Sequence, residues 1–120
     1  MIRRVTDSAE ASDIYGEDLT ALVSDQRNVC LTNGKDIAIF AFRGPGIFEG
    51  HLRFVSRGRE AIKVGKAMLA EIDARMIWGP TPVHLRHARW FQRQLGFVSH
   101  GIMATPEGDC ELFVMEDICP

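Results

Sequence analysis

The sequence contains little cysteine. Cys30, Cys110 and Cys119 are its only three, and they lie far apart in the chain. An odd number of widely spaced cysteines suits neither a disulfide framework nor a zinc site. The pattern favours reduced thiols, so we expect a cytoplasmic protein without a metal site.

Long apolar runs and a strong charge of one sign are also missing. No apolar run of about 18 residues or more occurs, so we expect no membrane span. The first ten residues contain a basic pair but no apolar segment typical of a secretory signal. The formal net charge of −2 argues against nucleic acid as a partner.

What is present is an ordinary composition for a folded domain. Hydrophobic residues make up 46% of the chain and charged residues 25%, which is typical of globular proteins. A chain of 120 residues is long enough to bury a core and short enough for one domain. We therefore expect residues 1–120 to form a single domain.

The most informative stretch runs from Ile47 to Ala70. Its first part, 47–55, alternates between apolar and polar residues and predicts a strand. After the basic turn 56–59 the apolar period becomes helical. A helix that begins directly after a glycine-containing basic turn presents free backbone N–H groups, which suit a phosphate. An ordinary strand–helix junction would show the same pattern.

The remaining periodicities predict a mixed sheet. The expected strands are 1–5, 28–32, 36–42, 47–55, 76–78, 97–103 and 110–115, and the expected helices are 9–24 with a break near Gly16, 59–75 and 83–95. Strands 28–55 would form an antiparallel meander around an Asn33-Gly34 turn. The strands flanking the 59–75 helix would be parallel. The fold class is therefore α/β.

Several short motifs accompany this order of elements. The chain opens with IRRVTDSAEA, carries the Asn33-Gly34 hairpin, and enters the turn 56–59 from HLRFV. Near its end, LRHARWFQRQLGF closes a helix with Leu-Gly-Phe. The ordered set resembles the GCN5-related N-acetyltransferase (GNAT) superfamily over nearly the whole chain. It implies a GNAT-like mixed sheet with antiparallel N-terminal strands, a parallel central pair and helices on both faces.

The same resemblance implies an acetyl-CoA-dependent N-acetyltransferase that moves the acetyl group directly to an amine. Acetyl-CoA would be a co-substrate, with its pyrophosphate at the turn and helix start. The cofactor-binding residues implied are Val55, Arg57, Gly58, Arg59, Glu60, Ala61 and Lys63. The acceptor amine cannot be read from the sequence. Family members often dimerise, so a homodimer stays open.

Basic residues gather around this turn and helix. They are Arg53, Arg57, Arg59, Lys63 and Lys66, with Glu60 among them. The cluster suits a polyanion such as coenzyme A. A DNA-contacting face or a plain solvated helix face are the alternatives.

Glu49 and His51 are the candidates for the chemistry. They stand two apart in a predicted strand, so both side chains point to one face. A histidine titrates near neutral pH and suits general-base work, and a carboxylate can orient it. We predict His51 as the base with Glu49 as its partner. The alternative is a solvent-facing polar side of the strand.

Three departures favour a second hypothesis. Glu60 and Ile62 stand where the family's loop has small residues, and Gln92 stands where the family has a tyrosine general acid. The runs Glu49-Gly50-His51 and 57–61 are also similar to small GNAT-like proteins of phages and prophages. The alternative is therefore an inactive GNAT-like binding or structural protein of phage or prophage origin, which would be virion-associated.

The space between two strands separates these hypotheses. A gap between strands 47–55 and 76–78 that is open to solvent would favour cofactor binding. A gap plugged by Met68, Ile62 or Trp78 would favour the structural protein.

Overall fold

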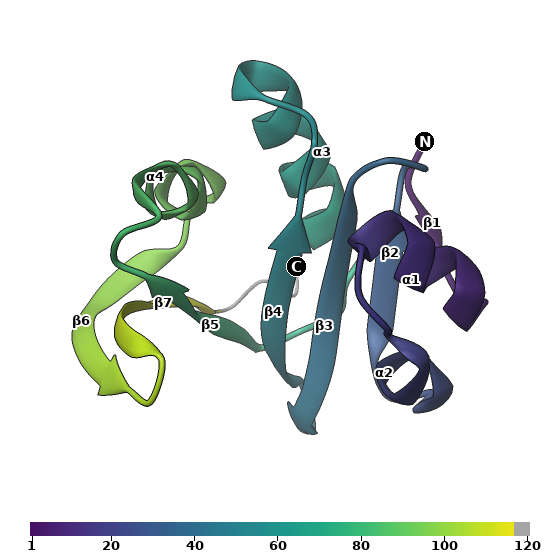
Figure 1. Cartoon of the computed structure of the whole chain (residues 1–120), viewed down its shortest axis with the longest axis horizontal. Helices are drawn as coiled ribbons and strands as arrows, with labels where there is room; N and C mark the ends of the chain where they lie inside the picture. The colour runs from purple at the N-terminus through teal and green to yellow at the C-terminus, as the bar shows by residue number, and fades with distance from the viewer. Residues whose placement is uncertain (117–120) are drawn as a thin grey trace.

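The computed structural model describes residues 1–116, so Cys119 lies outside the described residues. The strands are β1 (Arg3–Arg4), β2 (Val29–Thr32), β3 (Ile37–Gly44), β4 (Ile47–Arg53), β5 (Met76–Pro82), β6 (Val98–Thr105) and β7 (Gly108–Glu116). The helices are α1 (Ser8–Tyr15), α2 (Thr20–Ser24), α3 (Gly58–Ala70) and α4 (Arg86–Leu95) (Figure 1). The predicted order of elements is confirmed. No helix within residues 1–116 is long and apolar enough to cross a membrane.

The strands form a seven-stranded sheet in the order β1-β2-β3-β4-β5-β7-β6. Strands β4 and β5 pair in parallel, and the other neighbours pair antiparallel. Helix α3 connects the parallel pair. The predicted antiparallel meander and parallel central pair are therefore confirmed.

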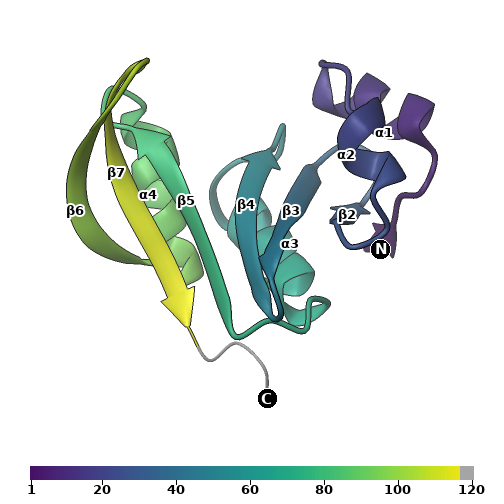
Figure 2. The same cartoon turned by 90° about the horizontal axis from the view of Figure 1, so that it is seen from below.

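Helices cover both faces of the sheet. Figures 1 and 2 show α1 and α2 on one face and α3 and α4 on the other. The alternation of β3 explains this, because Ile37 and Ile39 belong to the core cluster of α1 and α2, whereas Ala38 and Phe40 belong to the cluster of α3 and α4. Both clusters are buried, so the apolar run of β3 is the centre of the molecule.

Strand β5 is longer than predicted. The sequence prediction ended it at Trp78, because Gly79-Pro80-Thr81-Pro82 looks like a strand breaker. In the structure β5 continues to Pro82 and pairs with β7 along its whole length. On the other side its ladder with β4 ends at Glu49↔Trp78. From Gly79 onward this side of β5 is an edge, where proline is tolerated.

Helix α4 begins later than predicted, at Arg86. Leu85, which lies within the predicted helix 83–95 at the spacing of its apolar residues, is the N-cap residue and is 45% exposed, whereas Phe91 and Leu95 are buried. Two arginines of α4, Arg89 and Arg93, form ion pairs with a buried carboxylate. Arg89 Nε and Arg93 Nη2 bond the carboxylate of buried Glu111 at 2.7 and 2.5 Å.

Helix α3 packs as predicted and ends at Ala70, earlier than expected. Ala61, Val64, Gly65 and Met68 are buried along its inner side. A Cβ atom on Gly65 would lie 2.7 Å from the side chain of Leu95. The missing side chain therefore lets α3 approach α4 closely.

Candidate functional site

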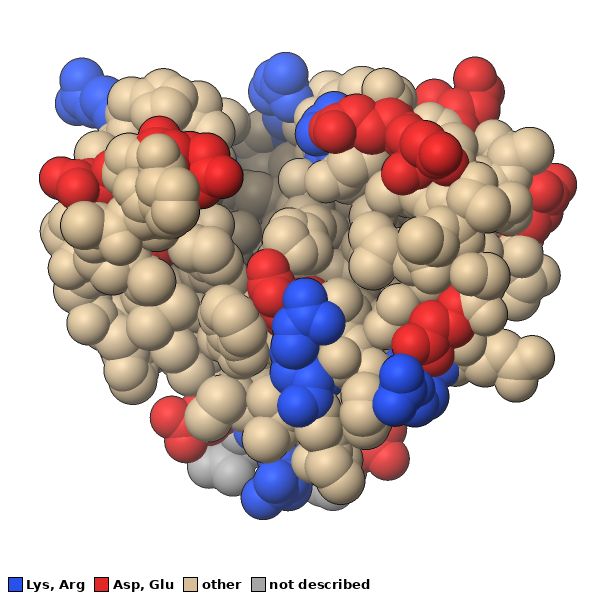
Figure 3. Space-filling model, turned by 60° about the horizontal axis from the view of Figure 1, so that its bottom comes forward, with Lys and Arg blue, Asp and Glu red and all other residues tan. Residues whose placement is uncertain are grey.

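A cleft opens where β4 and β5 separate. The two strands share three residue pairs, the last being Glu49↔Trp78. A Cβ atom on Gly79 would lie 2.9 Å from the carbonyl oxygen of Gly50, so two glycines meet where the strands diverge. Beyond them lies a cavity of about 170 Å³. The space-filling view shows the surface hollowed between the two halves of the molecule (Figure 3).

The cleft passes through the sheet. His51 and Leu52 both line it, although adjacent residues of a strand point to opposite faces. Thr81 lines it from the α4 face, since its pair in β7 is Glu111, which α4 contacts. Trp78 pairs with Glu49 and therefore shares the face of His51. A ligand on one face can thus meet a ligand on the other.

On the α4 face, two polar side chains line the cleft without a partner. Thr81 is buried, and Gln92 projects from α4. No hydrogen bond within residues 1–116 involves the Thr81 hydroxyl or the Gln92 amide group. Both can therefore donate a hydrogen bond to a ligand, and an amide cannot donate a proton as an acid.

His51 lies on the opposite face with Glu49. The distance from His51 Nε2 to Glu49 Oε2 is 3.0 Å. Arg43 holds the other oxygen of Glu49 through Nε at 3.1 Å and Nη2 at 2.9 Å. Glu49 is therefore fixed by Arg43 and can orient the imidazole. A neutral imidazole that donates Nε2–H to Glu49 keeps Nδ1 as its proton acceptor.

Tyr15, at the end of α1, lines the same face of the cleft. Arg53 holds this end of α1 against β4 by donating to the Tyr15 carbonyl at 2.8 Å and to Glu17 at 2.9 Å. Its guanidinium also lies 4.3 Å from the centroid of the Tyr15 ring. Arg53 was predicted in the basic cluster of α3. The prediction is wrong for this residue, because strand alternation turns it to the α1 face.

The start of α3 has no side-chain cap. Arg57 is the N-cap residue and its side chain makes no capping bond. Within the described part of the chain, no group accepts the N–H of Gly58, Arg59 or Glu60. Gly58 has a φ of 58°, in the region that favours glycine. Exposed N–H groups at a helix start attract anions.

At the start of α3, only some of the predicted cofactor-binding residues present a free side chain. Arg59 and Lys63 are exposed, and no carboxylate among residues 1–116 pairs with them. Arg57 uses Nη1 to hold the carbonyls of Phe54 and Ser56 at 3.0 and 3.2 Å. Ala61 is buried in the core.

A further predicted residue, Val55, has its N–H already bonded to Asp36. Neither Val55 nor Ala61 therefore presents a free group at the helix start. Glu60 is exposed in the first turn, where its N–H is free but its carboxylate adds an opposing charge.

Asp36 braces the turn that leads into α3. It is fully buried and accepts bonds from Val55 N, Ser56 N and Ser56 Oγ at 2.8, 2.9 and 2.6 Å. Asn33 Nδ2 donates to the same carboxylate at 3.1 Å. Burial raises the pKa of Asp36, but the bonds from Ser56, Asn33 and Val55 outweigh it and leave the pKa below its usual value.

The sequence prediction placed Asp36 inside a strand. In the structure the ladder begins at Thr32↔Ile37, so Asp36 ends the β2–β3 connection. The Asn33-Gly34 turn is correspondingly longer than a two-residue hairpin. The signal that could have found this role is the position of Asp36 directly before an apolar strand. A carboxylate that is buried there needs hydrogen-bond partners.

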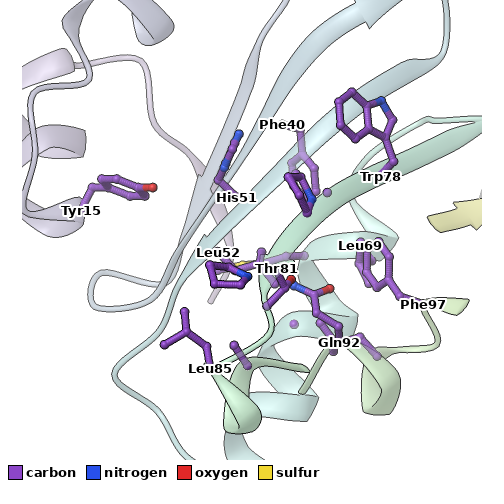
Figure 4. A pocket seen from close by; sticks show the side chains of 18 residues that line it. Tyr15, Phe40, His51, Leu52, Leu69, Trp78, Thr81, Leu85, Gln92 and Phe97 are labelled. Carbon is purple, nitrogen blue, oxygen red and sulfur yellow. The ribbon is translucent and has the colours of Figure 1, made fainter. Parts of the chain in front are cut away.

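Tyr15, Trp78 and Thr81 were also missed as site residues. Tyr15 is the chain's one tyrosine, and Trp78 was predicted only as a packing or surface-contact residue that could plug the gap. Figure 4 shows Tyr15 and Trp78 on either side of His51. No local pattern reports that an α1 residue reaches a cleft between β4 and β5.

Cys30 has no features of a nucleophile. Burial raises the pKa of its thiol to about 11, against a smaller lowering by Arg4. Its sulfur is therefore protonated at neutral pH. Cys30 is a buried residue of the core cluster beneath α1 and α2.

Comparison with known proteins extends the description of the fold. No family model and no curated protein matches the chain. Among solved structures, it is similar to the aminoglycoside acetyltransferase AAC(6')-Ib in complex with coenzyme A and kanamycin, with a TM-score of 0.65 and 16% identity over 98% of this chain and 94% of that one. Another structure of AAC(6')-Ib holds acetyl-CoA.

Two further structures are similar over most of their length. Mutant forms of the spermidine/spermine N-acetyltransferase SpeG from Vibrio cholerae have a TM-score of 0.74 and 11% identity, covering 97% of this chain and 93% of that one. An acetyltransferase of the GNAT family from Streptococcus pneumoniae has a TM-score of 0.70 and 15% identity, covering 97% and 98%. The chain therefore has the fold of the GNAT acetyltransferases.

Proposed function

We propose that the protein is an acetyl-CoA-dependent N-acetyltransferase that acts in the cytoplasm. The observation that carries the proposal is the cleft, which passes through the sheet between β4 and β5 and has His51 on one face. The surface is hollowed between the two halves of the molecule (Figure 3), and Met68 and Trp78 are among the residues that line a cavity of about 170 Å³ there. By the criterion set from the sequence, an open gap favours cofactor binding.

The cofactor would enter from the α3 and α4 face. The free N–H groups of Gly58, Arg59 and Glu60, with the cations of Arg59 and Lys63, suit its pyrophosphate. The thioester arm would then lie in the cleft beside Gly65, which lines it from α3. When bound, acetyl-CoA supplies the acetyl group as a thioester.

The chain's own groups would then act on the amine and the carbonyl. His51 Nδ1 takes one proton from the amine as its nitrogen attacks the carbonyl carbon and the C–N bond forms. Thr81 and Gln92 donate hydrogen bonds to the carbonyl oxygen as it gains charge. The C–S bond breaks, and the thiolate gains one proton while His51 releases its own. The products are the amide and free thiol.

A second candidate is a GNAT-fold binding protein without catalysis, with the phage or prophage origin that its short motifs suggest. One observation favours it: the polar side chain that α4 contributes to the cleft is the amide of Gln92, which cannot act as an acid. Direct transfer does not require that acid if water protonates the thiolate. The two candidates differ in turnover and not in cofactor binding.

The first experiment is calorimetric titration with acetyl-CoA. We expect micromolar affinity, weakened at least tenfold in an Arg57→Ala, Arg59→Ala double variant. An Arg3→Ala, Arg27→Ala variant removes the same charge from a remote surface and should bind like the native protein. Because Arg57 also braces its turn, Arg59→Ala alone should still weaken binding severalfold. No binding at millimolar acetyl-CoA would overturn the proposed function.

A further inference from the structure

We propose that the acceptor is a primary amine carried on an apolar group, preferably an aromatic one, and not a polycation. The proposal rests on the proposed function and names the substrate class of the same cleft. It comes from the residues that line the face of the cleft opposite α3 and α4. The cofactor occupies the other face, so this face is left for the acceptor.

Strand register identifies the lining of the acceptor face. Trp78 shares the face of His51 through the pair Glu49↔Trp78. Pro80 and Pro82 follow Trp78 at intervals of two, so they point the same way. Tyr15 completes this wall from α1. The wall therefore consists of two aromatic rings, an imidazole and two prolines.

This lining carries no fixed charge. Of the 18 described residues that line the cleft, none is Asp, Glu, Lys or Arg. Figure 3 shows carboxylates on the rims of the hollow, but they do not enter the lining. A polycation that enters the cleft would leave its charges without counter-charges, which is costly.

The two carboxylates attached to this face are already neutralised. Glu17 bonds Arg53 at 2.9 Å, and Glu49 is shared between Arg43 at 2.9 Å and His51 at 3.0 Å. A second cation that bound to either of these carboxylates would have to break its existing pair. The charge balance therefore favours an acceptor with one amino group.

The aromatic rings supply what such an acceptor needs. Tyr15 and Trp78 lie on either side of His51 (Figure 4). Arg53 fixes the Tyr15 ring by its bond to the Tyr15 carbonyl and its place over the ring. Fixed rings stack with an aromatic group and attract an ammonium until it loses its proton. Spermidine and kanamycin carry several amino groups but no aromatic ring, so they would gain no stacking from these rings.

The test measures acetyl transfer by release of free thiol, with phenethylamine, spermidine and kanamycin as acceptors. We expect kcat/KM for phenethylamine to exceed both others at least 100-fold. In a Tyr15→Ala variant, KM for phenethylamine should rise at least tenfold, while Tyr15→Phe, which keeps the ring, should retain native KM. Equal or better use of spermidine or kanamycin would overturn the acceptor class and leave the proposed function intact.

If the protein does not turn over any acceptor, its binding preference can still be measured by tryptophan fluorescence. The chain has two tryptophans, and Trp90 is exposed on α4 outside the cleft lining. In a Trp90→Phe variant, Trp78 is the one remaining indole, so its fluorescence reports occupation of the acceptor face. We expect phenethylamine to change this fluorescence at concentrations at least 100-fold below spermidine. No preference would overturn the inference, whereas preference without thiol release would overturn only the proposed function.

Discussion

At the scale of single residues, the proposed chemistry depends on how the imidazole of His51 is held. Glu49 contacts Nε2 of His51, and Arg43 in turn fixes Glu49. In a neutral imidazole one ring nitrogen is the proton acceptor, and that nitrogen is Nδ1 when Nε2 carries the proton toward Glu49. Glu49 is thus a positioning residue, and its place two residues before His51 follows from the strand period.

Replacement of His51 should separate binding from turnover. We expect His51→Gln to lower kcat about 100-fold or more, the usual range for loss of a general base. The affinity for acetyl-CoA should stay native, because the proposed cofactor site lies on the other face. Thiol release and calorimetry measure the two quantities.

His100 offers a matched control, since it is exposed on β6 and does not line the cleft. His100→Gln should leave kcat native. Native turnover in His51→Gln would show that His51 is not the base.

At the scale of elements, one buried carboxylate connects a hairpin to a helix start. Asp36, from the β2–β3 connection, holds Val55 and Ser56 in the turn between β4 and α3. The turn must keep its shape for the N–H groups of Gly58 and Arg59 to point at one ligand. The hydrogen bonds of Asp36 would therefore couple the β2–β3 connection to the proposed cofactor site through Ser56.

Asp36→Asn should destabilise the protein at neutral pH by about 2 kcal/mol, since bonds to a buried charged group are lost. The pKa of Asp36 is lower in the folded than in the unfolded state. Its contribution to the free energy of unfolding is therefore present at neutral pH and disappears as the pH falls through the folded-state pKa. Urea unfolding at pH 7 and in strong acid measures the change.

The gap in stability between native and Asp36→Asn proteins should narrow in acid. Asp13→Asn, at an exposed position of α1, should show no such gap at either pH. An equal gap at both pH values would contradict the role of the ionised carboxylate. Weaker acetyl-CoA binding by Asp36→Asn at pH 7 would be the functional sign of the same coupling.

At the scale of the whole molecule, the sheet consists of two halves that meet over a short ladder. Three residue pairs join β4 to β5, compared with seven between β5 and β7. Helices α3 and α4 meet through Gly65 and Leu95 across the same junction. The halves touch tightly at Gly50 and Gly79 and then separate, which creates the cleft.

A side chain at this junction should push the halves apart. We expect Gly79→Ala to lower the free energy of unfolding by about 2 kcal/mol, as overpacking does, because its Cβ atom would meet the Gly50 carbonyl at 2.9 Å. Chemical denaturation measures the stability, and calorimetry should show weaker acetyl-CoA binding. Gly44→Ala is the control in β3, since its Cβ atom would meet nothing nearer than 3.8 Å. Equal stability of the two variants would contradict the tight junction.

Much of this architecture could be predicted from the sequence. The change of period between Ile47 and Ala70 placed β4, the turn and α3, and the alternation of β4 placed Glu49 and His51 on one face. Apart from the placement of Arg53 in the basic cluster of α3, the errors were at boundaries. Leu85 looked like a core residue by its spacing, and Gly79-Pro80 looked like the end of β5, because a periodic pattern does not report which neighbours a segment meets.

The sequence by itself determined the order of elements, the inward faces of β4 and α3, and the free N–H groups at the start of α3. These depend on contacts between residues close in the chain, where the strand and helix periods apply. Only the tertiary structure decided that Tyr15 and Trp78 line one face of a cleft with His51, and that Asp36 braces Ser56. Those contacts join residues distant in the chain, and they form only when the sheet assembles and its two halves diverge.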